Sequence, residues 1–116
     1  HQLALAAANH VRRRRDSLSM AIIWSPEARR DLDEIFASIL AENPSVAVAV
    51  LDRIEEKVLL LAEYPAAGRA GRVMGTRELV VSDYPYVIPY RVKADQVEII
   101  RVLHGARRWP PSEDLV

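Results

Sequence analysis

Arginines, tyrosines, one histidine and one tryptophan gather in the second half of the chain. The set comprises Arg77, Arg91, Arg101, His104, Arg107 and Arg108, interleaved with Tyr84, Tyr86, Tyr90 and Trp109. Guanidinium groups hold phosphates and aromatic rings stack on bases, so this set could hold a nucleic acid. Cleavage of RNA by its own 2′-hydroxyl needs a proton acceptor, cations for the charged phosphorane and an acid for the leaving oxygen. His104 could be the acid or the base, with Arg77 and Arg91 as the phosphate clamp.

The same residues also have a purely structural interpretation. Arg91 would then lie on a strand and pair with Glu78 or Glu98, and His104 would end the last strand with its ring hydrogen-bonded. The sequence leaves both interpretations open, so Arg77, Arg91 and His104 remain candidates for a site.

Trp109 follows two arginines and has two interpretations of its own. It could fold back to cover an edge of the sheet. Alternatively, Arg107, Arg108 and Trp109 form an exposed anchor of the residue types that binding hot spots favour.

Other common chemistries lack their residues. No cysteine occurs in the 116 residues, and His104 is the only histidine besides His1 and His10 near the start. A disulfide and a thiolate zinc site are therefore excluded, and a metal centre is not expected. The glycines of residues 66–75 lack the preceding strand and following helix of a phosphate-binding loop. We expect no cofactor and no metal.

The net charge of zero hides an asymmetry along the chain. Residues 27–63 hold nine acidic and four basic residues, whereas residues 64–108 hold eight basic and four acidic ones. Two electrostatically distinct surfaces indicate two kinds of partner, and the whole is not basic enough for a dedicated nucleic-acid binder. Apolar runs such as residues 58–62 are far too short to cross a bilayer, so we expect a cytoplasmic protein without membrane contact.

The local signals predict a strand, two helices and three further strands. Residues 21–24 are apolar and read as a strand. Ser25, Pro26 and Glu27 have the residue types of a helix start, and Asn43-Pro44 ends this helix and begins the next. Tyr64-Pro65 ends the second helix, and residues 66–75 are expected to be a loop. The short connection makes the helices an antiparallel hairpin.

The helices are expected to be amphipathic. In the first, the apolar positions are Ala28, Leu32, Ile35, Phe36 and Ile39, and the polar side carries Arg29, Arg30, Asp31, Asp33 and Glu34.

Three strands with short connections fill residues 76–109 and favour an antiparallel meander. In the middle run, Tyr86, Ile88, Tyr90 and Val92 share one face. The last run, residues 96–103, is read as one strand with Val97, Ile99 and Leu103 on one face and Glu98, Ile100, Val102 and then His104 on the other. Pro89 inside the middle strand requires a free edge or a bulge. The fold class is α+β, a helical hairpin packed on a sheet.

The chain divides into three parts. Residues 1–19 include four consecutive arginines and look foreign to the rest, so we expect a leader of vector or upstream origin, with Met20 as the natural start. Residues 20–109 form the domain, and residues 110–116 form a C-terminal tail.

Several stretches together resemble one known family. These are SPEARRDLDEI, the EYPAAG that ends the second helix, RELVVSDYPYVIPYRV and VEIIRVLHGAR, which lie between residues 25 and 107. The chain resembles the RelE/ParE superfamily of toxins from type II toxin–antitoxin modules, over residues 20 to about 109. The resemblance implies a helical hairpin on an antiparallel sheet. It also implies a bacterial toxin held inactive, in a hetero-oligomer, by a cognate antitoxin whose tail folds over the toxin's helices and sheet.

The resemblance implies one of two activities. RelE-like members enter the ribosome and cut mRNA, whereas ParE-like members bind and block DNA gyrase without chemistry of their own. RelE-like toxins carry an arginine where this sequence has Val87, and this chain's helices are acidic. We therefore expect a gyrase inhibitor, not an enzyme, with Arg107, Arg108 and Trp109 binding the target. The alternative is a ribosome-dependent endoribonuclease using Arg77, Arg91 and His104.

The antitoxin is expected to bind the first helix. Its predicted contacts are Leu32, Ile35, Phe36 and Ile39.

Overall fold

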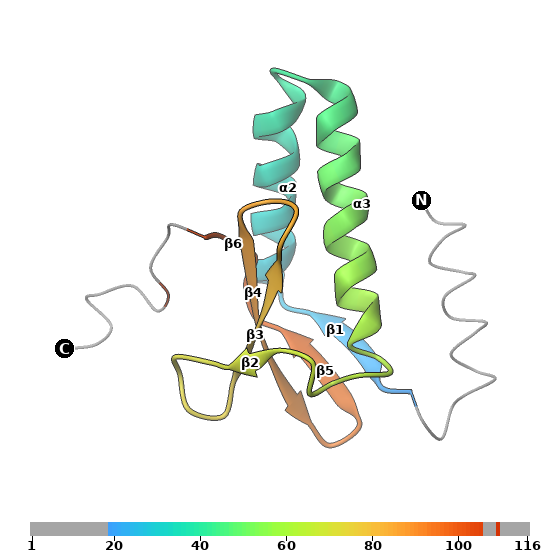
Figure 1. The fold of residues 1–116 in the computed structure, drawn as a ribbon, viewed down its shortest axis with the longest axis vertical. Helices are drawn as coiled ribbons and strands as arrows, with labels where there is room; N and C mark the ends of the chain where they lie inside the picture. Colours follow the sequence, from blue (N-terminus) through green and yellow to red (C-terminus); the bar gives the residue numbers. More distant parts are fainter. Residues whose placement is uncertain (1–18, 106–108, 110–116) are drawn as a thin grey trace.

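A computed structural model describes residues 19–105 and 109 of the chain (Figure 1). Its elements in chain order are β1 (Ala21–Trp24), α2 (Pro26–Leu40), α3 (Pro44–Leu60), β2 (Arg69–Ala70), β3 (Arg77–Val81), β4 (Tyr86–Lys93), β5 (Gln96–Ile99) and β6 (Leu103–His104). The predicted α+β fold, a strand followed by a helical hairpin and an antiparallel meander, is confirmed. The leader proposed for the first residues lies, apart from Ser19, outside the described residues.

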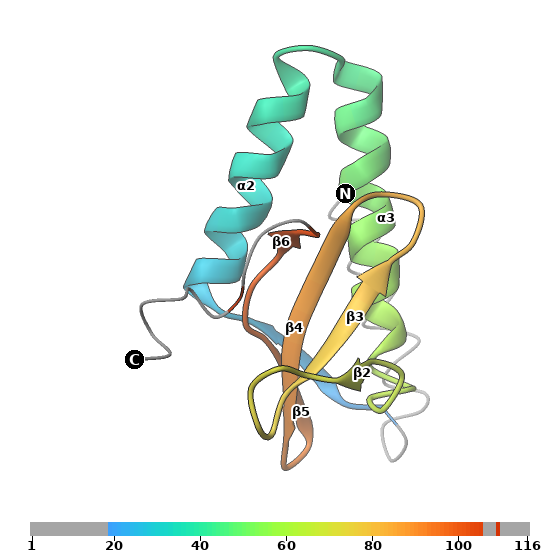
Figure 2. The same ribbon diagram turned by 60° about the vertical axis from the view of Figure 1, so that its left-hand side comes forward.

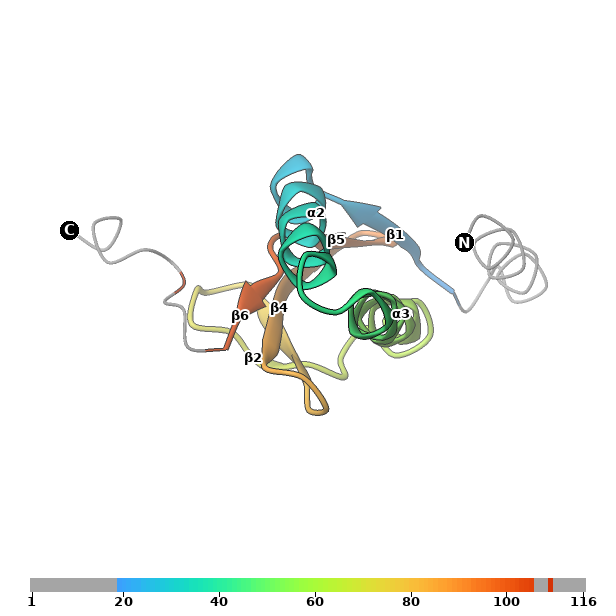
Figure 3. The same cartoon turned by 90° about the horizontal axis from the view of Figure 1, so that it is seen from above.

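The strands form one sheet in the order β1-β5-β4-β3-β2, and β6 pairs with β4 beyond the end of β5. The pairs β2–β3, β3–β4, β4–β5 and β4–β6 are antiparallel, whereas β1 lies parallel to β5. In Figures 2 and 3 the hairpin of α2 and α3 stands on one side and the sheet curves around α3. The short strand β2 falls in residues 66–75, where we predicted only a loop.

Both helices begin as their sequences indicate. The Ser25 hydroxyl accepts a hydrogen bond from the Ala28 N–H at 2.9 Å, and the Asn43 side chain accepts one from the Val46 N–H at 3.3 Å. A proline follows each capping residue, where its missing N–H costs nothing. Ser25 also donates its hydroxyl to the Ile100 carbonyl at 2.9 Å, so this cap ties the start of α2 to the end of β5.

The core lies between the sheet and the helix hairpin. Its fully buried members include Val50, Ile54 and Val58 of α3, Ile88 and Tyr90 of β4, and Val97 and Ile99 of β5. The predicted alternation along β4 is confirmed, because Tyr86, Ile88 and Tyr90 all face the helices. Val92 has the same orientation but is 41% exposed, since the strand continues past the helices there.

The last predicted strand is broken in two. β5 ends at Ile99, and the N–H groups of Ile100 and Arg101 both point to the Pro89 carbonyl, at 2.9 and 3.5 Å. Pro89 has no N–H on the side that faces β5. The chain after Ile99 can therefore leave the regular strand pairing without losing a hydrogen bond from Pro89. Of the two alternatives for Pro89, the structure shows the bulge.

The bulge changes which residues face the core. Val102 is buried in the core, Leu103 pairs with Val87 on the other face, and His104 pairs with Tyr86. The predicted faces were therefore wrong from Val102 onward, because one bulge shifts the side-chain alternation.

An ion pair holds the bulge against α2. Arg101 donates from Nε and Nη2 to the two carboxylate oxygens of Asp31, at 2.6 and 2.9 Å, and the Val102 N–H donates to the same carboxylate at 2.9 Å. Asp31 is only 8% exposed, so its predicted place on the polar side of α2 was wrong. Hydrogen bonding to Asp31 is the main reason why the pKa of Arg101 is raised.

A second clamp joins β4 to the loop after α3. The Tyr90 hydroxyl donates to the Pro65 carbonyl at 2.7 Å and accepts from the Gly68 N–H at 2.8 Å. A Cβ on Gly68 would lie 2.6 Å from Tyr90 Cε1, so a side chain at that position would displace the ring. The Pro65-x-x-Gly68 spacing thus brings the Pro65 carbonyl, as acceptor, and the Gly68 N–H, as donor, to the same Tyr90 hydroxyl.

We expect the substitution Asp31→Asn to destabilise the fold by about 3 kcal/mol, because it leaves the partly buried Arg101 without its counter-charge. Urea unfolding followed by circular dichroism measures this. The control is Glu56→Gln, which removes the exposed pair Arg53–Glu56 and should cost under about 0.5 kcal/mol. Equal costs for the two variants would show that the pair does not hold the bulge.

We expect Tyr90→Phe to cost about 2 kcal/mol at pH 7, because a buried carbonyl and a buried N–H lose their partner. Burial raises the pKa of Tyr90 above its ordinary value of 10.0. The folded state therefore holds this proton more tightly than the unfolded state, and the stability present below pH 10 is lost as the pH rises through the folded pKa. The free energy of unfolding between pH 8 and 11 should fall more steeply for the parent than for Tyr90→Phe. Parallel curves would contradict this assignment.

Candidate functional site

One face of the sheet carries no helix. Strand alternation directs Ile23 of β1, Arg91 of β4 and Glu98 of β5 to this face, and they lie in one row across the three strands. Ile23 is 43% exposed. We call this surface the open face.

The open face is hollowed beside this row. A hollow of about 500 Å³ lies over the pair of Arg91 and Glu98, whose Nε and Oε1 atoms are 3.1 Å apart. Ile23, Ile100 and Trp109 also line it, and it reaches the start of α2. Apolar and paired charged side chains therefore surround a volume in the range of ligand and side-chain pockets.

Trp109 lies against the open face. It lines the hollow beside Arg91 and also a second one of about 10 Å³ that Glu78 and Pro89 share. Arg72 donates from Nη1 to the Trp109 carbonyl at 3.5 Å, and the residue is half-buried. Of its two interpretations, this placement favours the one in which the tryptophan folds back over the sheet.

Glu78 is a buried carboxylate beneath Trp109. It is 2% exposed, and it accepts from Arg69 Nη2 at 3.2 Å and from the Arg72 N–H at 3.1 Å, while Arg72 Nε lies 3.4 Å away. Two half-exposed guanidinium groups share one carboxylate, so a positive charge remains at the rim of the open face. Our sequence analysis considered Glu78 only as a partner for Arg91, whose partner is Glu98.

The candidate ribonuclease residues do not come together. Arg77 pairs with Tyr90 and His104 pairs with Tyr86, so both lie on the helix-facing side of the sheet, on opposite flanks of β4. Four residues of β4 separate the two positions, about 13 Å along the strand. Arg91 lies on the open face instead. Three groups on two faces cannot contact one phosphate.

Each of these residues also has a structural environment. Arg77 Nη1 donates to the Gly68 carbonyl at 2.9 Å and to the Ala66 carbonyl at 3.4 Å. The His104 ring meets the Tyr86 ring edge-on, with centroids 5.8 Å apart and an interplanar angle of 83°.

Of the predicted target-binding residues, the structure places only Trp109. Arg107 and Arg108 lie outside the described residues. Near Trp109, the cations that the structure describes as exposed are Arg72 and Arg91, and both are engaged by carboxylates.

The predicted antitoxin contacts on α2 are largely covered. Leu32, Ile35 and Ile39 are partly buried against the core, and Phe36 is half-buried outside that cluster. Apolar side chains with a larger exposed fraction lie elsewhere on the hairpin and just after it. They are Leu40, Val46, Val48, Leu60 and Tyr64. We did not predict these residues as contacts. The pattern does contain a signal, since Val46 and Val48 flank the buried Ala47 and therefore lie outside the buried face of α3.

The part of the chain that the structure describes contains no cluster of three histidine, aspartate or glutamate side chains that could hold a metal ion. Neither of its two helices is long and apolar enough to span a bilayer.

Residues 22–109 match the family model of the ParE toxin of the type II toxin–antitoxin system parDE. A putative toxin, Y4kP of Sinorhizobium fredii, is 52% identical over 89 residues, which are 77% of this chain and 92% of that protein. The toxin RelE3 of Caulobacter vibrioides is 38% identical, over 72% of this chain and 91% of its own length.

A solved structure shares the fold. The chromosomal ParDE toxin–antitoxin system from P. aeruginosa contains a chain that is 30% identical, with a TM-score of 0.69. The match covers 74% of this chain and 96% of that one. The sequence match and the fold agree over the whole described domain, and the chain belongs to the ParE toxin family of type II toxin–antitoxin systems.

Proposed function

We propose that this toxin stops growth by binding and blocking DNA gyrase, and that a cognate antitoxin neutralises it in a hetero-oligomer. The choice of gyrase over the ribosome is supported by the separation of Arg77, Arg91 and His104. Ribosome-dependent cleavage needs a proton acceptor and phosphate-binding cations around one phosphodiester, and these side chains are divided between two faces.

Electrostatics support the same choice. The helix hairpin, residues 27–63, has five more acidic than basic residues, nine against four, and would repel ribosomal RNA. Binding to a protein target requires only a complementary surface. The open face offers one, with the exposed Ile23, the half-buried Trp109 and the rim arginines Arg69 and Arg72.

The antitoxin follows from the comparisons. The P. aeruginosa structure is that of a ParDE toxin–antitoxin system, and the match covers nearly all of the chain concerned there. The hairpin exposes apolar side chains on both helices, Leu40 on α2 and Val46 and Val48 on different sides of α3, and a folding antitoxin segment would cover part of this surface. Leu32, Ile35 and Ile39 would support this surface from below.

We expect the purified toxin to inhibit DNA supercoiling by gyrase and to leave translated mRNA intact in primer extension. The control is His104→Ala, which should keep both the inhibition and the growth arrest. A ribosome-dependent cut that disappears with His104→Ala would instead establish the endoribonuclease activity with Arg77, Arg91 and His104.

We expect Trp109→Ala to raise the toxin concentration for half-inhibition of gyrase by at least about tenfold. The half-buried ring lines the hollow of the open face, and truncating a tryptophan at an interface costs over about 1 kcal/mol. The control is Trp109→Phe, which keeps an aromatic ring beside the hollow of the open face and should retain most of the inhibition. Antitoxin binding reports that both variants are folded. Equal inhibition by Trp109→Ala and the parent would remove Trp109 from the target surface.

A further inference from the structure

The loop between β2 and β3 is held rigidly. The Thr76 N–H donates to the Val73 carbonyl at 3.1 Å, the Thr76 hydroxyl donates to the same carbonyl at 2.6 Å, and the Gly71 N–H donates to the Thr76 carbonyl at 2.9 Å. Gly75 has a φ of 82°, a conformation that favours glycine at the third position of a tight turn. The buried Glu78 fixes the start of the loop through the Arg72 N–H.

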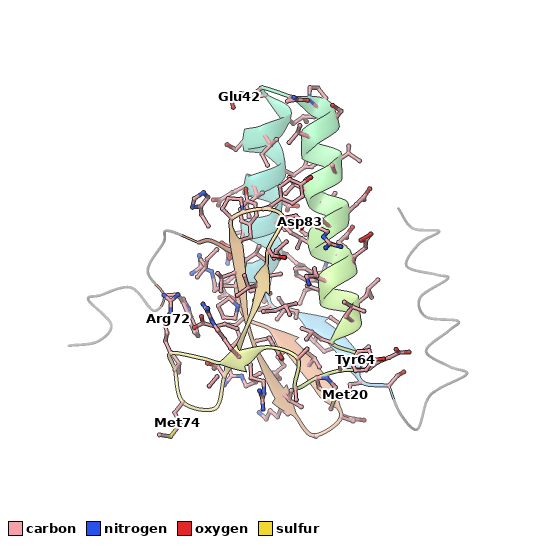
Figure 4. All side chains as sticks on the ribbon, viewed as in Figure 1. Met20, Glu42, Tyr64, Arg72, Met74 and Asp83 are labelled. Atoms are coloured by element: carbon pink, nitrogen blue, oxygen red, sulfur yellow. The ribbon has the colours of Figure 1, made fainter. Side chains whose placement is uncertain are left out.

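This rigid loop presents a large apolar side chain to water. Met74 is 97% exposed at the tip of the loop and points away from the body of the protein (Figure 4). Many hydrogen bonds therefore stabilise a conformation in which Met74 contributes nothing to the core. A side chain held on a rigid loop needs little ordering when a partner binds, so Met74 could contribute to a contact that the neighbouring surface also makes.

A hollow of about 310 Å³ lies beside the loop. Ala70, Gly75, Thr76, Arg77 and Val92 line it. Arg77 pairs with Tyr90 in the sheet, and Val92 has the same orientation as Tyr90 along β4, so the hollow lies on the helix-facing side of the sheet. Val92 is 41% exposed because the helices do not reach this end. We call this the Arg77 hollow.

The Arg77 hollow has an uncompensated positive charge. The other arginines with described ion pairs, namely Arg53, Arg69, Arg72, Arg91 and Arg101, each face a carboxylate. The described contacts of Arg77 are the carbonyls of Ala66 and Gly68, both from Nη1. These neutral partners orient the guanidinium without cancelling its charge, and they leave Nε and Nη2 for an incoming carboxylate.

We propose that the Arg77 hollow binds an acidic segment of the antitoxin, with a carboxylate on Arg77 and apolar side chains against Val92 and Met74. The proposal rests on the proposed function, since it assumes that an antitoxin exists. A polypeptide fits better than a nucleic acid, because none of the residues that line the hollow has an aromatic ring for a base to stack on, and Ala70 and Val92 offer contacts for apolar side chains beside Arg77. The antitoxin fits better than the target, because the hollow shares its side of the sheet with the helix hairpin, whereas Trp109 lies on the open face.

The test compares two valines of equal exposure on opposite faces. Val92→Ser alters the Arg77 hollow, and Val80→Ser is the matched control, since Val80 is also 41% exposed but pairs with Val87 on the open face. Full-length toxin variants are titrated by calorimetry with the product of the reading frame that adjoins the toxin gene. We expect Val92→Ser to weaken binding at least about fivefold and Val80→Ser to change it less than twofold.

Charge is tested at Arg77 itself. Arg77→Ala should weaken antitoxin binding at least about tenfold and reduce its salt dependence, whereas Arg77→Lys keeps the charge and should recover part of the affinity. Met74→Ser, at a site without folding role, should weaken binding about threefold or more.

The outcomes separate this proposal from the proposed function. If the parent toxin binds no product of the adjoining gene, the antitoxin assignment itself fails. If the parent binds and Val92→Ser and Arg77→Ala bind equally well, the Arg77 hollow is not part of the interface. If these variants keep antitoxin binding but lose gyrase inhibition, the hollow belongs to the target and our assignment is overturned.

Discussion

The contact between Asp31 and Arg101 determines how the sheet and the helices fit together. A buried carboxylate on α2 receives two guanidinium N–H groups and one backbone N–H from the chain between β5 and β6. These donors are available only because the chain leaves the ladder opposite Pro89, which has no N–H to give. The Ser25 hydroxyl adds a second connection from the start of α2 to the carbonyl of Ile100. One missing donor in β4 thus creates the backbone conformation that α2 recognises.

The bulge also decides which side chains reach each face of the sheet. Before it, Ile99 packs into the core, and after it Val102 takes that role while Leu103 turns to the open face. His104 then lies beside Tyr86, far along β4 from Arg77 and on the other face from Arg91. The bulge therefore separates His104 from Arg91, whereas the register of β3 on β4 alone places Arg77 and Arg91 on opposite faces.

The two faces of the sheet serve different interactions in our proposals. The open face carries Trp109 over Pro89 and Glu78, together with a hollow lined by apolar groups and paired charges. The helix-facing side carries the hairpin and, beyond the helix ends, the Arg77 hollow with its unpaired cation. The separation also explains the charge asymmetry, since residues 64–108 supply the cations at both hollows.

Features that depend on near neighbours in the chain could be predicted from the residues alone. Ser25 and Asn43 capped their helices as predicted, and the alternation of Tyr86, Ile88 and Tyr90 gave the buried face of β4, because capping and strand periodicity act over a few residues. Other features depend on contacts that form only in the folded chain. The burial of Asp31, the parallel pairing of β1 with β5, the pairing of β2 with β3 and the bulge at Pro89 all depend on partners between 7 and 75 positions away in the chain. Candidate site residues show the same limit: composition identified Arg77, Arg91 and His104, but which of them share a face depends on register and on one bulge, and these follow from packing against the helices.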